Sequence, residues 1–148
     1  MDERDKQLLR EAQSNLPICE RPFKALGERV GMSEQEVLER LKRLKAQGVI
    51  RRIGGSFDSA KLGFASTLCA AKVPEEKLKD FVETVNSYHG VTHNYRRGHE
   101  FNVWFTFIAE SEQSINQALA EIAERTGVKE ICSLPAVEKF KIKVDFPV

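Results

Sequence analysis

The chain has 148 residues, and its 41% hydrophobic and 30% charged fractions are those of an ordinary globular protein. No run of about 18 apolar residues would cross a bilayer and the opening residues are mostly charged, so we expect no signal peptide and a cytoplasmic protein without membrane attachment. The net charge of +1 divides into 13 Lys and Arg against 10 Asp and Glu in residues 1–62 and 10 against 12 in residues 63–148, which gives little support for nucleic-acid binding.

Three short helices are predicted in the first third of the chain. Apolar residues at helical spacing indicate one helix that ends before Pro17 and a second that ends at Gly31. A third helix begins at Ser33, because Ser33 and Glu36 have the spacing of a capping box, and it ends at Gly48. The short turn between the second and third helices is typical of a helix-turn-helix.

Residues 49–57 follow the third helix and combine β-branched residues, a Gly-Gly turn signal and two arginines, Arg51 and Arg52. This composition predicts the wing of a winged helix-turn-helix. We therefore assign residues 1–62 to an N-terminal winged helix-turn-helix domain.

Residues 63–148 have the order strand, helix, strand, strand, helix, strand. This is the ferredoxin-like βαββαβ pattern, so the predicted fold class is α+β with two small domains. The predicted elements are a strand over residues 64–73, a helix from Pro74, strands over residues 91–97 and 101–108, a helix capped by Ser111, and a strand over residues 128–134, after which comes a further alternating strand over residues 140–146.

The two middle strands of this half are predicted to form a hairpin. Gly98 and His99 have the Gly-first order of a two-residue type II′ turn. This turn pairs Tyr95 with Asn102, and directly opposed residues share a sheet face. Arg97 would stand at the rim of that face, and the opposite face would be apolar and covered by the helices. The side chains expected together on the uncovered face are His93, Tyr95, Asn102, Trp104 and Thr106.

The cysteines and histidines predict neither a disulfide framework nor a metal site. The chain has three cysteines, Cys19, Cys69 and Cys132. They are odd in number, far apart and without a CxxC pair, so we expect buried thiols. His89 and His93 have H-x-x-x-H spacing, but Gly90 interrupts any helix that would place both on one face.

Three segments resemble the family of leucine-responsive and asparagine-type (Lrp/AsnC) regulators. They are the opening D-x-x-L-L at Asp5 to Leu9, the stretch VGMSEQEVLERLKRLKAQGVI over residues 30–50, and the KLGF joint at Lys61 to Phe64. This resemblance implies a winged helix-turn-helix followed by a ferredoxin-like effector domain. Alone, it implies a DNA-binding transcriptional regulator that senses an amino acid.

The second half, together with one stretch upstream of it, is similar to the siroheme decarboxylases, which are enzymes related to those regulators. The similar stretches are HNYRRGHEFNVWFT over residues 93–106, IRRIG over residues 50–54, and LPA over residues 134–136 leading to FKI over residues 140–142. The family removes CO2 from two acetate side chains of siroheme, giving didecarboxysiroheme on the route to haem or to d1-type haem. The resemblance implies a carboxy-lyase that pairs with a paralogous subunit as a heterodimer, or forms a homodimer.

The candidate residues fit this chemistry. Siroheme is a flat macrocycle with carboxylates at its rim, which arginine binds through two donors. Loss of CO2 leaves an electron pair on a methylene that the conjugated ring delocalises, so we expect no cofactor. We assign substrate binding to Arg51, Arg52, Arg96, Arg97, Asn102 and Trp104.

Proton delivery to that methylene is the remaining task. A histidine ordinarily has a pKa of about 6.5 and donates protons at neutral pH. We expect His93 to be the donor or to contact the siroheme iron, with Tyr95 as its hydrogen-bonding neighbour and His99 as the second candidate.

Other functions remain open from the sequence. A DNA-binding regulator would read bases with the start of the third helix, which here carries the carboxylates of Glu34, Glu36 and Glu39, so we expect weak or absent DNA binding. The same glutamates would stabilise the helix dipole without any DNA. A non-catalytic tetrapyrrole sensor would use the same sheet face as the enzyme, and His93 and Tyr95 would also suit a half-buried dimer interface.

Overall fold

A computed structural model describes residues 1–141 and 146–148 and divides them into two units. The first unit contains residues 1–55 together with the described residues from Lys141 onward, and the second contains residues 56–140. This boundary differs from the predicted one after residue 62. The physical reason is a turn in which the Phe64 amide donates to the Ser59 carbonyl at 2.9 Å, so that this segment leads directly into the first strand of the second unit.

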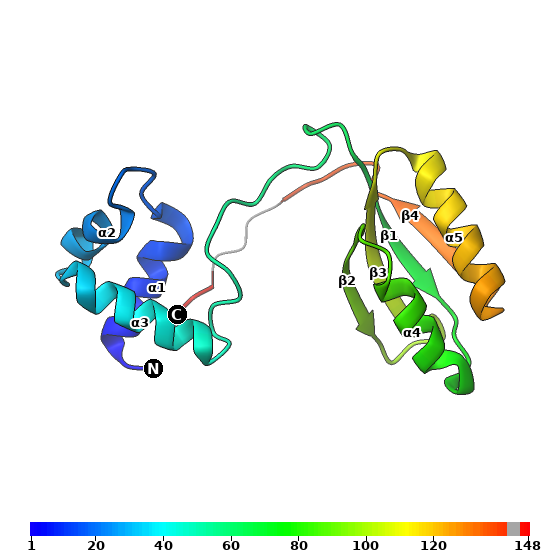
Figure 1. Ribbon diagram of the computed structural model, residues 1–148, viewed down its shortest axis with the longest axis horizontal. Coiled ribbons are helices and arrows are strands. Elements are labelled where there is room, and N and C mark those ends of the chain that lie inside the picture. Colours follow the sequence, from blue (N-terminus) through cyan, green and yellow to red (C-terminus); the bar gives the residue numbers. More distant parts are fainter. Residues whose placement is uncertain (142–145) are drawn as a thin grey trace. The chain divides into compact units, whose positions relative to one another are not determined.

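Three helices form the first unit (Figure 1). They are α1 (Glu3–Asn15), α2 (Pro22–Val30) and α3 (Glu34–Ala46). The short α2–α3 turn confirms the helix-turn-helix, and its Gly31 has a φ of 65°, which glycine adopts without steric cost. The buried apolar residues at the centre of this unit are Leu8, Leu26, Val30, Met32, Val37 and Leu41.

The predicted capping box at α3 is only half formed. The Ser33 hydroxyl accepts a hydrogen bond from the Glu36 amide at 3.1 Å, but the Glu36 carboxylate pairs with Arg40 at 2.9 Å instead of returning to Ser33. The reciprocal box is found at α1, where Asp2 and Asp5 each accept from the other's backbone amide. The capping box with both of its hydrogen bonds therefore fixes the start of α1, not that of α3.

Residues 49–57, all of them described, contain no strand, so the predicted wing lacks its β-structure. The amides of Val49 and Ile50 instead donate to the Leu44 carbonyl, at 3.0 and 3.3 Å, and complete the end of α3. Ile50 also packs against the helical core. These backbone donors are therefore not available for a hairpin ladder.

The second unit has the predicted βαββαβ order. Its elements are β1 (Ala65–Ala71), the short 3-10 helix η1 (Glu75–Lys77) leading into α4 (Leu78–Asn86), β2 (Val91–Arg96), β3 (Val103–Ala109), α5 (Glu112–Thr126) and β4 (Ile131–Pro135). The sheet order is β2-β3-β1-β4, and every neighbouring pair is antiparallel. Of the predicted final strand, Phe140 and Lys141 lie outside any strand, and residues 142–145 are outside the described residues.

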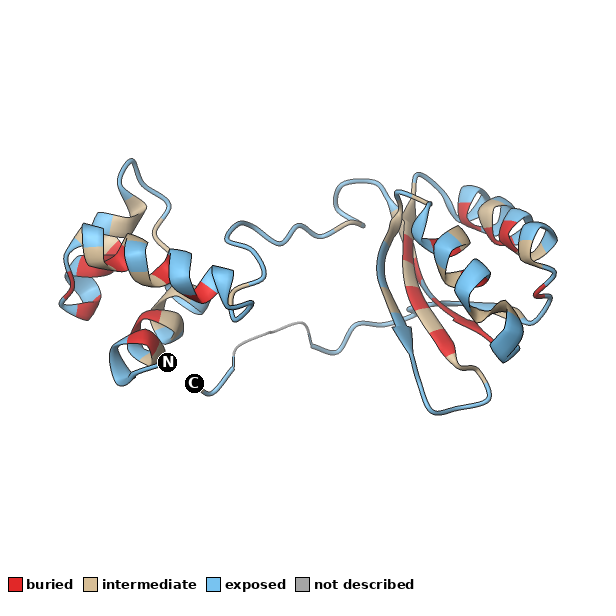
Figure 2. Ribbon diagram, turned by 60° about the horizontal axis from the view of Figure 1, so that its bottom comes forward, coloured by how far each residue is buried: buried red, intermediate tan, exposed pale blue. Residues whose placement is uncertain are grey.

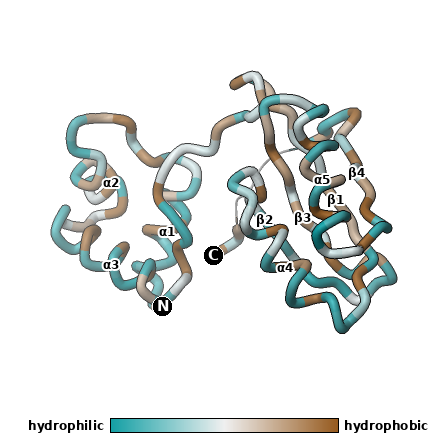
Figure 3. Tube along the Cα trace, turned by 45° about the vertical axis from the view of Figure 1, so that its right-hand side comes forward, coloured by the Kyte–Doolittle hydropathy of each residue, from teal (hydrophilic) through white to brown (hydrophobic). Residues whose placement is uncertain are grey.

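Helices α4 and α5 lie on the same face of the sheet, and the buried residues of the unit lie between them and the strands (Figures 1 and 2). Alternation along β3 produces this layer, because Val103, Phe105 and Phe107 are buried while the residues between them are half-buried. Figure 3 shows hydrophobic and hydrophilic stretches that alternate along the helices, as expected of helices that have one face on the sheet. The face of the sheet opposite the helices is called the open face below.

Candidate functional site

The hairpin of β2 and β3 is joined by a loop over Arg97–Asn102, not by the predicted two-residue turn (Figure 1). Tyr95 pairs with Trp104 and His93 with Thr106, so the predicted register is wrong by two residues. Side chains of a strand alternate with a period of two, so this shift leaves each strand residue on its predicted face. The loop is longer than the predicted turn because the hydrogen bond that closes it joins the Arg97 amide to the Asn102 carbonyl, at 2.8 Å.

Four strands contribute to the open face, and several of its apolar side chains are uncovered. Leu68 is 42% exposed, Leu134 46% and Tyr95 48%, although each lies within a regular strand. An uncovered apolar surface in the middle of a sheet indicates a binding surface. Two cross-strand rows traverse it, one of Tyr95, Trp104, Ala70 and Cys132 and one of His93, Thr106, Leu68 and Leu134.

His93 and Tyr95 lie side by side on β2. Their ring centroids are 6.1 Å apart with an interplanar angle of 24°, which is a stacked arrangement. The His93 Nδ1 is 3.1 Å from the hydroxyl of Thr92, and both rings are exposed. The predicted pair therefore stands together on the open face, with a proton-carrying imidazole beside a phenol.

Arg97 and Trp104 form a second pair at one end of the open face. The guanidinium carbon of Arg97 lies 5.8 Å from the centre of the Trp104 ring, a cation–π distance. The indole N–H donates to the Phe101 carbonyl at 2.7 Å, which fixes the ring. Among the described residues Arg97 pairs with no carboxylate, so its donors remain available to an anionic ligand.

Arg96 differs from Arg97 in both position and partner. It follows Tyr95 in β2 and pairs with Val103, whose side chain is under the helices, so it is not on the open face. Its guanidinium binds the carboxylate of Glu75 at 2.7 Å. The structure therefore does not bring Arg96 together with the other candidates.

His99 and Asn102 are held within the loop. The His99 ring stacks on Phe101 at 6.3 Å, and its Nδ1 accepts from the Phe101 amide at 3.1 Å. Asn102 precedes β3, and its side-chain amide binds the backbone of Val73, with Oδ1 accepting at 2.9 Å and Nδ2 donating at 2.8 Å. Neither polar group of that amide is directed at a ligand.

Arg51 and Arg52 belong to the first unit, whereas the other candidate residues belong to the second. Both arginines line a cavity of about 830 Å³ whose apolar walls include Leu9, Leu16 and Ile50. The Arg52 guanidinium donates to the Gly55 carbonyl at 2.7 Å. The structure therefore places Arg51 and Arg52 at a partly apolar cavity of the first unit.

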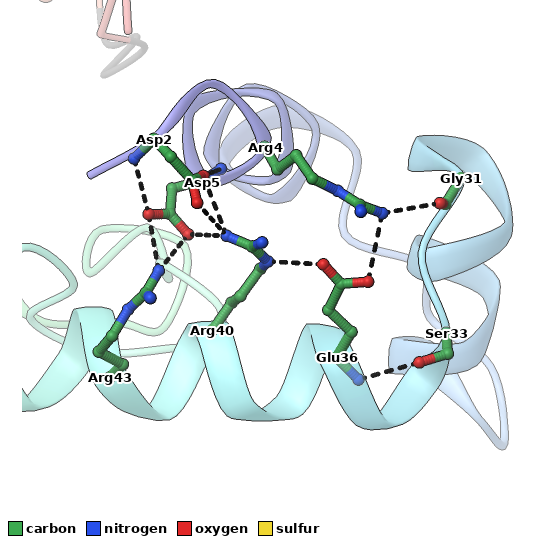
Figure 4. Close-up of polar contacts among 8 residues, drawn as sticks. All are labelled: Asp2, Arg4, Asp5, Gly31, Ser33, Glu36, Arg40 and Arg43. Atoms are coloured by element: carbon green, nitrogen blue, oxygen red, sulfur yellow. Dashed lines mark hydrogen bonds and ion pairs between the residues drawn. The ribbon is translucent and has the colours of Figure 1, made fainter.

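Sequence reasoning missed an ion-pair network centred on Asp5, which joins α1 to α3 (Figure 4). Asp5 is 1% exposed, and its carboxylate accepts from Arg40 at 2.7 Å and from Arg43 at 2.5 Å. Burial alone raises the pKa of Asp5, but the Asp2 amide and the Arg40 guanidinium outweigh it and the pKa is lowered. The hydrogen bond from Arg40 likewise lowers the pKa of Asp2 to about 2. The sequence signal was the pair of arginines one turn apart on α3.

The cysteines are only partly as expected. Cys69 is buried in the core of the second unit, and burial raises the pKa of its thiol to about 12. Cys19 and Cys132 are exposed, so the expectation of buried thiols is wrong for them, Cys132 because it lies on the uncovered face of the edge strand β4. No three His, Cys, Asp or Glu side chains of the described part are placed to hold a metal ion. No helix within residues 1–141 or 146–148 is long and apolar enough to span a membrane.

Two family descriptions match the chain. Residues 5–51 match the siroheme decarboxylase NirDL-like HTH domain, and residues 61–141 match the AsnC-like ligand binding domain. The siroheme decarboxylase alpha subunit of Desulfovibrio desulfuricans is 53% identical over 146 residues, which covers 99% of this chain and 84% of that protein.

Solved structures add two comparisons. The siroheme decarboxylase NirDL in complex with an iron-uroporphyrin III analogue is 33% identical with a TM-score of 0.70, and the match covers 96% of this chain and 48% of that one, so this chain spans about half of that longer protein. The transcriptional regulator NMB0573 of Neisseria meningitidis, solved with L-Met, has a TM-score of 0.82 at 18% identity, and the match covers 99% of this chain and 96% of that one. At that identity the likeness shows a shared fold alone.

Proposed function

This chain belongs to the siroheme decarboxylase family, and we propose that it is one subunit of a siroheme decarboxylase whose substrate binds at the open face of the sheet. One observation carries the location. The open face combines the stacked His93–Tyr95 pair, the unpaired Arg97 above Trp104 and exposed leucines. A domain that needed only a stable core would not require this combination.

Binding follows from the shape and charge of siroheme. The uncovered side chains of Leu68 and Leu134 offer apolar area to a flat macrocycle, and Arg97 offers two parallel donors to a carboxylate at its rim. Because Trp104 already supports the guanidinium, its indole acts as a base for Arg97 more than as a free stacking platform. Arg51 and Arg52 remain proposed contacts for further carboxylates.

The reaction breaks one carbon–carbon bond in each acetate. Its electron pair stays on the ring-bound methylene as CO2 leaves, and a proton from the protein converts that carbon to a methyl group. The macrocycle accepts the electron pair into its conjugated system, so we propose that no added cofactor is needed. The protein then has to hold the acetate and deliver one proton for each CO2 released.

His93 suits proton delivery better than His99. The Thr92 hydroxyl near the His93 Nδ1 accepts from a protonated ring as well as it donates to a neutral one. The Nδ1 of His99 accepts from the Phe101 amide, so protonation of that nitrogen breaks the bond that holds the ring in the loop. Tyr95, stacked on His93, is the proposed hydrogen-bonding neighbour during the transfer.

A second subunit is part of this proposal. The relative from Desulfovibrio desulfuricans is named an alpha subunit, and the open face of this chain leaves Leu68 and Leu134 exposed within regular strands. We propose that a paralogous subunit, or a second copy of this chain, covers the part of this face that siroheme leaves free.

A DNA-binding regulator is the other function consistent with the fold. The likeness to NMB0573 supports this function only through the shared fold, and a fold alone does not determine a function. In α3, Arg40 and Arg43 are engaged by Asp2 and Asp5, so these two cations are less available to phosphate. A tetrapyrrole sensor would bind the same ligand without releasing CO2.

A titration of siroheme against charged variants tests the proposed site. Leu68→Glu places a carboxylate at the centre of the open face, and we expect siroheme binding to weaken by about tenfold or more because like charges oppose each other there. Gln113→Glu adds the same charge on the exposed surface of α5 and should bind as the unaltered protein does. Equal affinity of both variants for siroheme would contradict the location.

A further inference from the structure

We propose that Asn102 is a positioning residue that holds the loop Arg97–Asn102 so that Arg97 meets the substrate. This inference rests on the proposed function, because it assigns Arg97 to a carboxylate of siroheme. Asn102 itself touches no substrate in this account. It acts through the loop that carries Arg97 and His99 between β2 and β3 (Figure 1).

The Asn102 side chain extends the ladder between β1 and β3 beyond its last backbone pair. That last pair is Ala71 with Val103, and Val73 lies two residues further along. Val73 donates its amide to the Asn102 Oδ1 at 2.9 Å and accepts from the Asn102 Nδ2 at 2.8 Å. The side-chain amide thus takes the place of a backbone peptide, using one donor and one acceptor in the correct orientation.

The position makes those two bonds costly to lose. Val73 is 3% exposed and belongs to the core, so its backbone groups have little access to water. The other bonds of the loop are the Arg97 amide to the Asn102 carbonyl, the Phe101 amide to His99, the Trp104 indole to the Phe101 carbonyl, and an exposed ion pair of Glu100 with Lys72 at 3.6 Å. Asn102 is therefore the side chain that ties the loop by hydrogen bonds to the buried chain between β1 and α4.

The link to Arg97 runs through Phe101 and Trp104. The Phe101 carbonyl, next to Asn102 in the chain, accepts from the Trp104 indole, and that ring lies beneath the Arg97 guanidinium. A displaced loop would move this carbonyl and the base of the cation–π pair together. By holding the loop, Asn102 fixes the Phe101 carbonyl that binds the Trp104 ring. It also fixes its own carbonyl, which accepts from the Arg97 amide.

The chain contains a single tryptophan, so its fluorescence reports on this loop directly. Asn102→Leu keeps a side chain of similar size and adds no charge, but it removes both groups that bind the Val73 backbone, and we expect a red-shifted Trp104 emission and stronger quenching by acrylamide. Ser111→Ala is the matched control, because it removes a side-chain-to-backbone bond at the start of α5, away from the loop. It should leave the emission unchanged.

Siroheme titrations separate positioning from general weakening of the fold. Arg97→Ala should weaken binding by about tenfold, and Asn102→Leu should weaken it by a similar factor. When Arg97 is already Ala, the added Asn102→Leu change should alter affinity by about twofold or less, because both variants disturb one contact. A folded Asn102→Leu protein with unaltered emission, unaltered affinity or fully additive losses would overturn the proposal.

If the Asn102 variants do not fold, hydrogen exchange on the unaltered protein tests whether Asn102 binds the Val73 backbone. The amide of Val73 should be protected because Asn102 Oδ1 accepts from it, and exchange at the rate of an exposed loop would overturn the proposal. If the unaltered protein binds no siroheme, the proposed function fails, whereas emission and exchange still determine whether Asn102 holds the loop.

Discussion

His93 is a side chain that the fold itself does not require. Its ring is exposed, stacks on Tyr95 and lies outside both hydrophobic cores. Removal of the ring therefore deletes no buried contact, and a fall in rate would report on proton transfer. Arg97 and the leucines of the open face would still bind the substrate.

We predict that His93→Ala slows CO2 release by about 10²–10⁴-fold, the usual contribution of a positioned general acid, while siroheme affinity changes little. His89→Ala is the control, because His89 is also exposed but lies in the turn between α4 and β2. Single-turnover rates, with affinity measured separately, check this. Full turnover by His93→Ala together with a loss in His99→Ala would move the donor to the loop.

The sequence predicted which strand residues share the open face but not how the loop is built. His93, Tyr95 and Trp104 were placed correctly because facing depends on parity, which a shift by two residues preserves. The role of Asn102 could not be predicted, because its partner is the backbone of Val73, 29 positions away in the chain. A backbone partner leaves no residue type in the sequence that would reveal the contact.

At the scale of elements, α1 and α3 are joined by charge as well as by apolar packing. Asp5 is buried between two arginines of α3, and Arg40 also binds Asp2 and Glu36 (Figure 4). The helix boundaries were predictable from apolar spacing and from Pro17 and Gly31. The ion pairs were not, because they depend on how the helices cross.

We predict that Asp5→Asn lowers the free energy of unfolding by about 2–3 kcal/mol, since it leaves Arg40 and Arg43 without their buried partner. Glu3→Gln, which removes only an exposed pair with Lys6, should lower the free energy of unfolding far less. Urea denaturation of the whole protein measures both changes. Equal stabilities of the two variants would show that the network contributes little.

The lowered pKa of Asp5 also predicts how stability depends on pH. A carboxylate whose pKa is lower in the folded state stabilises the fold above its unfolded pKa of about 3.9, and this stabilisation is lost as the pH falls through the folded pKa. The unaltered protein should therefore lose stability below about pH 4 more steeply than Asp5→Asn does. Parallel pH profiles would contradict the assignment.

The same network predicts weak DNA binding by α3. Its first turn is acidic, and Arg40 and Arg43 are already paired within the unit. Affinity for duplex DNA should be low, unspecific and only shallowly dependent on salt, because few phosphates are contacted. Selection from a random DNA library checks this, and recovery of a palindromic site bound in the nanomolar range would restore the regulator function.

At the scale of the whole molecule, the fold class was predictable because the order of helices and strands is encoded by local spacing. The predicted wing depended on pairing instead, and local composition does not determine pairing. The apolar open face is a further property of the whole chain, since it arises only when four strands are side by side.

We predict that the protein is a dimer in solution, preferably with its paralogous subunit, because pairing covers the part of the open face, towards the edge strand β4, that siroheme leaves free. Sedimentation velocity of the chain alone and mixed with that subunit measures this. Leu134→Glu should weaken association, and Gln113→Glu should not. A stable monomer that retains full activity would contradict the prediction.

The central claim is that this chain takes part in removing CO2 from siroheme at the open face. Its most direct test is to incubate the chain with siroheme without oxygen, alone and with its paralogous subunit, and to follow the tetrapyrrole by mass spectrometry. We expect siroheme to lose two CO2 units in succession when it is incubated with the unaltered protein. This loss should be slower with His93→Ala and smaller with Leu68→Glu at limiting siroheme. Siroheme of unchanged mass in every incubation, or equal rates in all three proteins, would contradict the central claim.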